Sequence, residues 1–343
     1  MNAAAPLTVT PCAEAETWDR TVNAMGGHPL QLWGWGDLKA AHRWSAERVF
    51  VHDASGEVVG ACQLLTRAVP GPLGGFVYAP RGPVFARAAG APGAVRADPA
   101  PAAIADAIAS YVRTSRRAVA VSLEPDEPAG SLELGAGWRA AHTPVLPART
   151  LILDLTQSED ELLADMTKKH RQYIRKSERE GGIEIRPVTT IAELDACLEV
   201  YRATSARADF GLHEDSYYRD ALTMLGEHAA VWASYVDDAP VAFLFLAASR
   251  RTAFELYGGM NELGQRLRAN YALKWHAIRA MRDRGVTRYD LGGLINDGVT
   301  TFKTGFASHE DVLAGSWDRP GPGYWVWNRG LPLAKKLVRA VSR

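Results

Sequence analysis

The chain has few cysteines, no net charge and no long apolar run. Its three cysteines, Cys12, Cys62 and Cys197, are too few and too far apart for a disulfide framework or a CxxC pair. The 39 basic residues balance the 39 acidic ones, so an anionic partner needs a local basic patch. Residues 241–248 form the longest apolar stretch, far short of the ~20 residues that cross a bilayer. With no signal-like N-terminus, these features predict a cytoplasmic protein.

Two kinds of catalytic site are also missing. The nine histidines are scattered, with no HxxxH pair and no His/Cys cluster. A Ser-His-Asp hydrolase of the common α/β type would need a G-x-S-x-G elbow, which does not occur. We therefore expect neither a metal nor a bound cofactor.

The length of 343 residues and the 47% hydrophobic content indicate two globular domains. Both halves show the same order of elements, namely three strands in a meander, a helix and a further strand. The first half places these at residues 48–53, 57–68, 74–82, 102–117 and 118–123, and the second at 230–236, 240–249, 252–259, 269–284 and 286–291. Helical sequence precedes each meander, at residues 33–42 and in three segments between 158 and 228.

This order favours α/β domains with mixed sheets over a fully parallel Rossmann sheet, which would need a helix between every pair of strands. It resembles the N-acetyltransferase-like (GNAT) fold, and this resemblance implies acyl transfer to an amine. We expect two tandem GNAT domains. The first covers residues 1–148 and is completed by the C-terminal segment 316–343, and the second covers residues 149–315.

The glycine-rich loop that holds the pyrophosphate of acetyl-CoA in this fold is missing from both halves. Residues 265–270 read QRLRAN, with Arg268 where the first glycine is required, and residues 80–83 read PRGP. An arginine side chain would block the close backbone approach that glycine permits. An acyl donor other than acetyl-CoA is favoured.

Four segments in order resemble the Fem family of aminoacyl-tRNA-dependent transferases, and together they cover nearly the whole chain. They are HPLQLWGWGDLK (28–39), YAPRGPVF (78–85), the segment 151–181 that includes TKKHRQYIRK, and YDLGG (289–293) followed by TFKTGF (301–306). The resemblance implies transfer of Gly, Ala or Ser from its tRNA ester to an amine on the stem peptide of a peptidoglycan precursor, which forms an interpeptide bridge. The implied partners are aminoacyl-tRNA and a UDP-linked or lipid-linked precursor.

Attack of an amine on an ester builds up an oxyanion, which fixed positive charge stabilises. Lys303, next to Phe302, matches the family's functional Phe-Lys pair, and we predict that it is catalytic with Phe302 positioning it. On sequence alone it could equally be a surface lysine between apolar anchors. Glu124, or Asp126 two residues later, is the candidate carboxylate for the attacking ammonium, although a solvated turn carboxylate fits as well. Asp290 is expected to bond local backbone N–H groups.

For the acceptor, the family's binding positions match Lys39, Arg207 and Tyr257. Lysine and arginine pair with phosphate, and tyrosine offers a ring and a hydroxyl. Packing roles remain an alternative for Lys39 and Tyr257. A tyrosine that a member of the family has four residues after this arginine is replaced here by Gly211.

For the donor tRNA, we predict a basic stripe on a helix that starts near Ser158. Its proposed phosphate contacts are Lys168, Arg171, Arg175 and Arg179, of which the three arginines are four residues apart and share one face. A solvated helix with basic residues near its C-terminal dipole is the alternative.

Basic and apolar residues also alternate in the C-terminal segment 331–343, which predicts a short amphipathic helix. It is expected to pack on the first domain or to contact the inner membrane face peripherally. Only one helix fits between Arg207 and Val231, which corresponds to a compact form of the family without its helical hairpin.

Three alternative functions remain on sequence grounds. They are an acetyl-CoA-dependent GNAT N-acyltransferase, a noncatalytic protein that binds tRNA or the precursor, and transfer of an amino acid to a small molecule or a protein. Motifs do not choose the amino acid, because one methylene changes binding by only ~1 to 3 kcal/mol.

Overall fold

The computed structural model describes residues 6–69, 71–88, 95–179, 182–208, 210–295 and 297–330. The chain forms two compact units. The first comprises residues 1–25, 31–148 and 312–343, and the second comprises residues 26–30 and 149–311. The predicted C-terminal amphipathic helix at 331–343 lies outside the described residues.

The first unit is built on a mixed sheet with the strand order β1-β2-β3-β4-β6-β16-β7, and β5 also pairs with β3. Its strands are β1 (Thr8–Pro11), β2 (Ser45–His52), β3 (Val58–Ala68), β4 (Gly75–Ala79), β5 (Val84–Phe85), β6 (Ala118–Leu123), β7 (Arg139–Ala140) and β16 (Trp317–Pro320), and its helices are α1 (Ala15–Ala24), α2 (Trp33–Ala41) and α3 (Pro101–Ser115). Alternate residues of β2 face opposite layers. Val49 and Val51 pack with α3, and Phe50 packs with Trp18 of α1.

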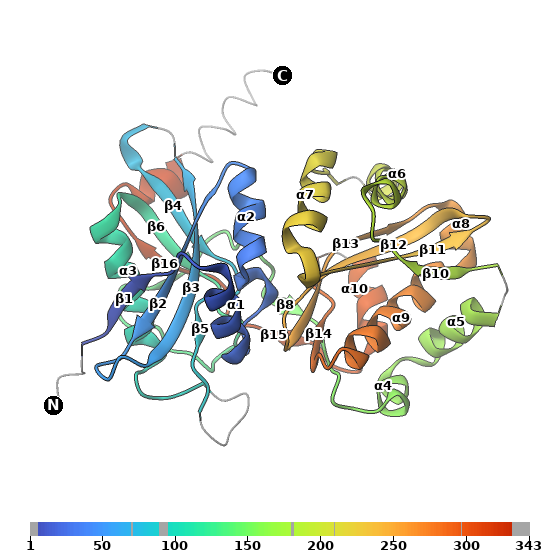
Figure 1. Ribbon diagram of the computed structural model, residues 1–343, viewed down its shortest axis with the longest axis horizontal. Coiled ribbons are helices and arrows are strands. Elements are labelled where there is room, and N and C mark those ends of the chain that lie inside the picture. The colour runs from blue at the N-terminus through green and yellow to red at the C-terminus, as the bar shows by residue number, and fades with distance from the viewer. Residues whose placement is uncertain are drawn as a thin grey trace. The chain divides into compact units, whose positions relative to one another are not determined.

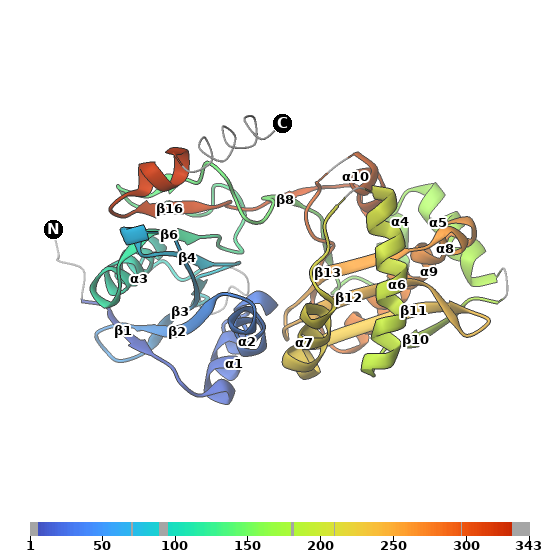
Figure 2. The same ribbon diagram turned by 90° about the horizontal axis from the view of Figure 1, so that it is seen from above.

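The second unit has the sheet order β10-β11-β12-β13-β14-β9. Its strands are β9 (Ile152–Asp154), β10 (Glu184–Pro187), β11 (Ala229–Val236), β12 (Ala239–Ala248), β13 (Thr252–Met260) and β14 (Arg288–Asp290), and its helices are α4 (Glu159–Asp165), α5 (Lys168–Arg179), α6 (Ile191–Ala208), α7 (Asp215–Leu225), α8 (Glu262–Leu267), α9 (Ala269–Asp283) and α10 (Asp297–Lys303). Helices α6 and α7 cover one face of this sheet, and α9 and α5 lie on the other (Figures 1 and 2).

Short elements complete the chain. The strands β8 (Arg149–Thr150) and β15 (Asp311–Val312) pair with each other, and the helical turns are η1 (Pro29–Gln31), η2 (Gly71–Leu73), η3 (Gly226–His228), η4 (Thr304–Phe306) and η5 (Val326–Gly330).

The repeat predicted from the element order is present in both units. In each, three antiparallel strands are followed by a helix and then by a strand parallel to the third, as β4 pairs with β6 and β13 pairs with β14. This confirms the prediction of two α/β units with mixed sheets. The structure adds β16 beside β6 and β9 beside β14, short strands that carry little pattern of their own.

One predicted helix was wrong. The segment from Ser158 to Arg179 was expected to be continuous, but it forms two helices, so four helices rather than three lie between residues 158 and 228. The first begins with the predicted cap, since the side chains of Ser158 and Glu161 bond each other's backbone N–H groups. It ends at Met166, whose backbone is extended and whose side chain is buried in the core.

Candidate active site of the second unit

A pocket of about 330 Å³ opens beside β13. Strand β14 pairs with β13 only at Thr252–Phe254, whereas β12 continues along the other edge of β13 as far as Met260. The edge of β13 beyond Phe254 is therefore left without a neighbouring strand. Side chains from α6, β12, α9 and α10 surround this open edge.

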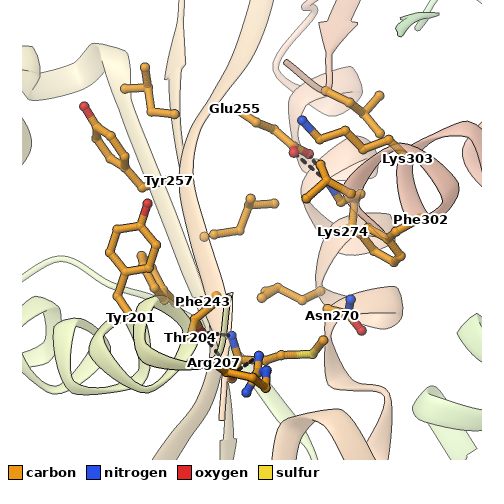
Figure 3. Close-up of a pocket in the computed structure, with 18 residues that line it drawn as sticks. Tyr201, Thr204, Arg207, Phe243, Glu255, Tyr257, Asn270, Lys274, Phe302 and Lys303 are labelled. Carbon is orange, nitrogen blue, oxygen red and sulfur yellow. Dashed lines mark hydrogen bonds and ion pairs between the residues drawn. The ribbon is translucent and has the colours of Figure 1, made fainter. Parts of the chain in front are cut away.

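A bulge in β13 divides the pocket into two halves. Leu246 of β12 faces Glu255 and Phe245 faces Tyr257, so Leu256 is an extra residue. Because neighbouring residues of β12 point to opposite faces, Glu255 and Tyr257 do so as well. Figure 3 shows Glu255 on the side of Lys274 and Lys303, and Tyr257 on the side of Tyr201.

The charged half contains a buried ion pair. Nζ of Lys274, on α9, lies 2.8 and 2.6 Å from the two carboxylate oxygens of Glu255, and the side chains are only 7% and 8% exposed. The hydroxyl of Tyr289 donates to the same carboxylate at 2.9 Å. A charge that is out of water needs a partner of this kind. Among the described residues that line the pocket, Lys303 is then the only lysine outside this pair.

Lys303 ends α10 and points toward Glu255 (Figure 3). Its ammonium donates to the carbonyl of Gly293, with 3.0 Å between Nζ and O. Burial lowers the pKa of Lys303 to about 8, although the carboxylates of Glu255 and Asp290 partly oppose this. A half-buried lysine with such a pKa is a common feature of functional sites.

Phe302 forms a wall of the same half. Its ring lies 5.1 Å from that of Tyr271, edge to face, and Nζ of Lys274 lies 5.2 Å from its centre. A ring face attracts a cation in this way. Phe302 thus packs against Lys274 and directly precedes Lys303 in α10.

The other half is aromatic. The ring of Tyr257 packs against Tyr201 and Phe245, and its hydroxyl donates to that of Tyr217 at 3.1 Å. Burial raises the pKa of Tyr257 well above its usual value and that of Tyr217 to about 12. These hydroxyls therefore stay neutral donors at physiological pH.

Arg207 lies at the end of this half, near the C-terminus of α6. Its guanidinium is exposed and donates to the carbonyl of Met260 at 3.1 Å. One turn earlier, Oγ1 of Thr204 accepts from the N–H of Met260 at 2.9 Å. A Cβ on Gly259 would lie 2.5 Å from that Oγ1, so glycine allows α6 to approach β13 this closely. The structure thus brings Arg207, Tyr257, Phe302 and Lys303 into one pocket.

Glu124, the predicted carboxylate, belongs to the first unit and is engaged there. Its Oε1 accepts from the N–H groups of Val145 and Leu146, at 2.9 and 3.1 Å, and from the hydroxyl of Ser316. Its Oε2 accepts from the hydroxyl of Tyr78. Both oxygens are thus hydrogen-bonded within the first unit, and only 2% of the residue is exposed.

The other candidates in the first unit are Asp126, which is half-buried, and Lys39 on α2. Nζ of Lys39 lies 4.5 Å from the ring centre of Trp35, and burial lowers its pKa to about 8. The motif that carries Lys39 is fixed to the second motif, because Nε2 of Gln31 donates to the carbonyl of Pro80 at 2.7 Å.

Asp290 bonds as expected from its place before two glycines. Its Oδ1 accepts from the N–H of Gly292 at 2.8 Å and from the hydroxyl of Thr150.

The predicted basic stripe needs one correction. Arg171 does not lie free on the surface, because its guanidinium donates to the carbonyls of Leu163, Ala164 and Met166 at the end of α4. It caps that helix, whose last carbonyls lack partners within the helix. Lys168, Arg175 and Arg179 are exposed on α5.

A shallow basic patch remains on α5. It is lined by Gln172, Tyr173, Arg175, Lys176, Arg179 and Arg268. The guanidinium of Arg268 stacks 4.1 Å above the ring of Tyr173. Arg268 is the single residue between α8 and α9, and its backbone is left-handed, with φ of 56°. The sequence did not predict this contribution to the patch.

Sequence reasoning also missed Glu255, Lys274 and Tyr201. A signal was present for the first two, since Glu255 is the only charged residue of β13 and Lys274 stands among the buried residues of α9. Tyr201 gave no signal, because an aromatic residue on a helix is ordinary core material.

No group of His, Cys, Asp or Glu that could hold a metal ion occurs among the described residues. Within the same ranges, no helix is both long and apolar enough to cross a bilayer.

Residues 164–304 match the family model described as Acetyltransferase (GNAT) domain. No curated protein matches the sequence. Among solved structures, that of FemX has a TM-score of 0.78 at 18% identity, over 93% of this chain and 99% of that one.

Two further structures have a lower TM-score of 0.53. A tandem GNAT protein from the clavulanic acid biosynthesis pathway is 14% identical, over 92% of this chain and 99% of that one. The C-terminal domain of a putative lysylphosphatidylglycerol synthetase from Agrobacterium fabrum is 15% identical, over 90% and 94%. The protein thus has the tandem GNAT fold predicted from its element order, and its similarity to the FemX structure agrees with the Fem-like character predicted from its four motifs.

Proposed function

We propose that the protein transfers an amino acid from aminoacyl-tRNA to an amine on the stem peptide of a peptidoglycan precursor. One observation carries this proposal most directly. The ammonium of Lys303 lies in a pocket where the only nearby carboxylate, among the residues that line it, is already paired with Lys274. Lys303 therefore remains available to a developing oxyanion.

The chemistry needs little more than positioning and charge. The amine nitrogen forms an amide bond to the carbonyl carbon, the ester C–O bond breaks, and the amine gives up a proton while the ribose oxygen gains one. The tetrahedral intermediate carries an oxyanion between these steps. A donor aimed at such an oxygen in a water-poor site contributes ~3 kcal/mol or more, and Lys303 is the group assigned this role, with Phe302 positioning it.

Binding roles follow from charge and exposure. Arg207 and Tyr257, together with Lys39 of the first unit, would bind the phosphate and peptide of the acceptor. Lys168, Arg175 and Arg179, joined by Arg268, would contact tRNA phosphates without reading sequence. Arg171 is withdrawn from this set because it caps α4.

Acetyl-CoA is the competing donor, since the matching family model is that of an acetyltransferase domain. At the start of α9, where the resemblance puts the first glycine of a phosphate-binding loop, the chain has Arg268. Its side chain is stacked on Tyr173, which leaves no glycine cradle for a pyrophosphate. This favours the tRNA ester as donor.

The acceptor class has a second candidate. One similar structure belongs to a putative lysylphosphatidylglycerol synthetase, whose name indicates an acceptor on a lipid. A precursor that is linked to a nucleotide or to a lipid on the cytoplasmic side of the membrane fits the predicted location and peripheral membrane contact.

The experiment follows radiolabelled Gly, Ala, Ser and Lys from charged tRNA onto three acceptors, namely UDP-linked pentapeptide, lipid-linked precursor and phosphatidylglycerol. We expect incorporation into a precursor. Incorporation only into phosphatidylglycerol would show that the acceptor is a lipid and would reject the peptidoglycan precursor. No incorporation, with acetylation of amines from acetyl-CoA instead, would reject the proposal.

A further inference from the structure

Two of the motifs seen in the sequence meet in the second unit at a buried histidine. His170 lies in the first turn of α5, is 4% exposed and contacts the segment that carries Lys303. Its Nε2 is 2.9 Å from the carbonyl oxygen of Phe302, and its Nδ1 is 2.8 Å from Oγ1 of Thr167.

The two contacts fix the state of the ring. A carbonyl oxygen can only accept, so Nε2 carries the proton and donates to Phe302, and Nδ1 accepts from the hydroxyl of Thr167. The N–H of Thr167 in turn donates to the carbonyl of Gly305 at 3.0 Å. One bond therefore holds the chain just before Lys303 and the other holds it two residues after.

Ring packing and a close approach to Gly305 add to these two hydrogen bonds. The imidazole lies 4.9 Å from the ring of Phe306 and 5.0 Å from that of Tyr271, edge to face in both cases. A Cβ on Gly305 would lie 1.8 Å from Cε1 of His170. The imidazole thus fills the space that a side chain at position 305 would need, and this contact accounts for the glycine in TFKTGF.

The charged surroundings favour the neutral ring. Burial lowers the pKa of His170, and the ammonium groups of Lys169 on α5 and Lys274 on α9 act in the same direction, while the hydrogen bond to the carbonyl of Phe302 partly opposes them. Tyr271, also on α9, is a phenol that stays neutral at physiological pH, since burial raises its pKa. His170 is thus held as a neutral donor.

We propose that His170 is a positioning residue that holds the Phe302–Lys303 turn and so sets the place of the Lys303 ammonium in the pocket. Its consequence for catalysis rests on the proposed function, but its effect on Lys303 does not. A histidine with only a packing role would affect stability and leave the titration of Lys303 unchanged.

The test measures Lys303 directly. The wild-type protein is labelled with a trace of an amine-reactive acetylating reagent across a pH series, and labelling at Lys303 is followed by mass spectrometry. We expect a titration near pH 8. His170→Phe keeps a ring but removes the donor, so the turn relaxes toward water, the apparent pKa of Lys303 rises, and its labelling at pH 8 falls severalfold.

Two further variants make the result specific. His170→Gln restores a donor for the carbonyl of Phe302 and is expected to return the titration close to that of the wild type. His276→Phe changes another half-buried histidine of the same unit, one that packs on Trp232, and is expected to leave Lys303 unchanged. Unchanged labelling in a folded His170→Phe protein would overturn the proposal.

If His170→Phe does not fold, the same labelling experiment is carried out with Thr167→Val. This variant removes the hydroxyl that bonds Nδ1 of His170 and also accepts from the His170 N–H. The apparent pKa of Lys303 is expected to rise by a smaller amount, whereas no shift overturns the proposal. Where transfer is observed, kcat is expected to fall at least tenfold in His170→Phe with little change in KM for tRNA. Absence of transfer in the wild type would reject the proposed function and leave the labelling result intact.

Discussion

At the scale of single residues, the site depends on the charge of Lys303. Among the described residues that line the pocket, Lys303 is the only lysine that is not paired with Glu255, whose ion-pair partner is Lys274. A lysine in water titrates near 10.4, but burial lowers the pKa of this one to about 8. The charged form is therefore lost within an experimentally accessible range of pH.

This yields a prediction for pH dependence. If the ammonium stabilises the oxyanion, kcat/KM falls as pH rises through about 8, because deprotonation removes the positive charge. Lys303→Arg keeps its charge, so its profile should lack this alkaline limb, although the larger guanidinium lowers the maximum about tenfold or more. Initial rates corrected for uncatalysed ester hydrolysis provide the measurement. The same alkaline limb in both proteins would assign the titration to another group.

The sequence predicted which residues gather in the pocket better than it predicted the contacts that each candidate makes. One pocket contains four of the predicted residues, namely Arg207, Tyr257, Phe302 and Lys303. By contrast, Glu124 and Arg171 are hydrogen-bonded to nearby backbone or hydroxyl groups. A sequence does not reveal this difference, because the partners of Glu124 lie 21 residues or more away along the chain.

At the scale of elements, the bulge in β13 creates the two halves of the pocket. It turns Glu255 toward α9 and Tyr257 toward α6. Element order and most strand limits followed from apolar alternation and turn residues. The bulge did not, because it exists only in the register with β12. The break between α4 and α5 was missed for a similar reason, since burial of Met166 and capping by Arg171 override a continuous helical pattern.

The contact between α6 and β13 gives a prediction about stability. Gly259→Ala would place a Cβ 2.5 Å from Oγ1 of Thr204, so the helix or strand must move, and we expect a loss of about 1–3 kcal/mol in the free energy of unfolding. Gly211→Ala is the control, because a Cβ there meets nothing within 4 Å. Urea denaturation measures both. Equal stability of the two variants would show that α6 does not need this close approach.

At the scale of the whole molecule, a net charge of zero means that the proposed binding of tRNA would depend on where the cations lie. The described residues gather Arg175, Lys176, Arg179 and Arg268 into one patch. If the overall field of the protein held the tRNA, loss of any cation would weaken binding equally. If a local patch holds it, only loss of a cation in that patch weakens binding strongly.

Charge reversal tests this difference. Arg175→Glu/Arg179→Glu should weaken tRNA binding by tenfold or more at low salt and reduce the slope of log K against log salt by about 1 to 2. Arg20→Glu/Arg113→Glu changes the net charge equally at exposed positions of the first unit and should have a much smaller effect. Filter binding over a salt series is the measurement. Equal losses in the two double variants would refute a local patch.

The most direct test of the central claim is single-turnover transfer from charged tRNA to the precursor pentapeptide, with the wild type, Lys303→Ala and the surface control Arg113→Ala. We expect transfer by the wild type and the control, and a loss of at least a hundredfold in Lys303→Ala, which is the usual effect of removing an oxyanion donor. Transfer at a normal rate without Lys303 would contradict the claim.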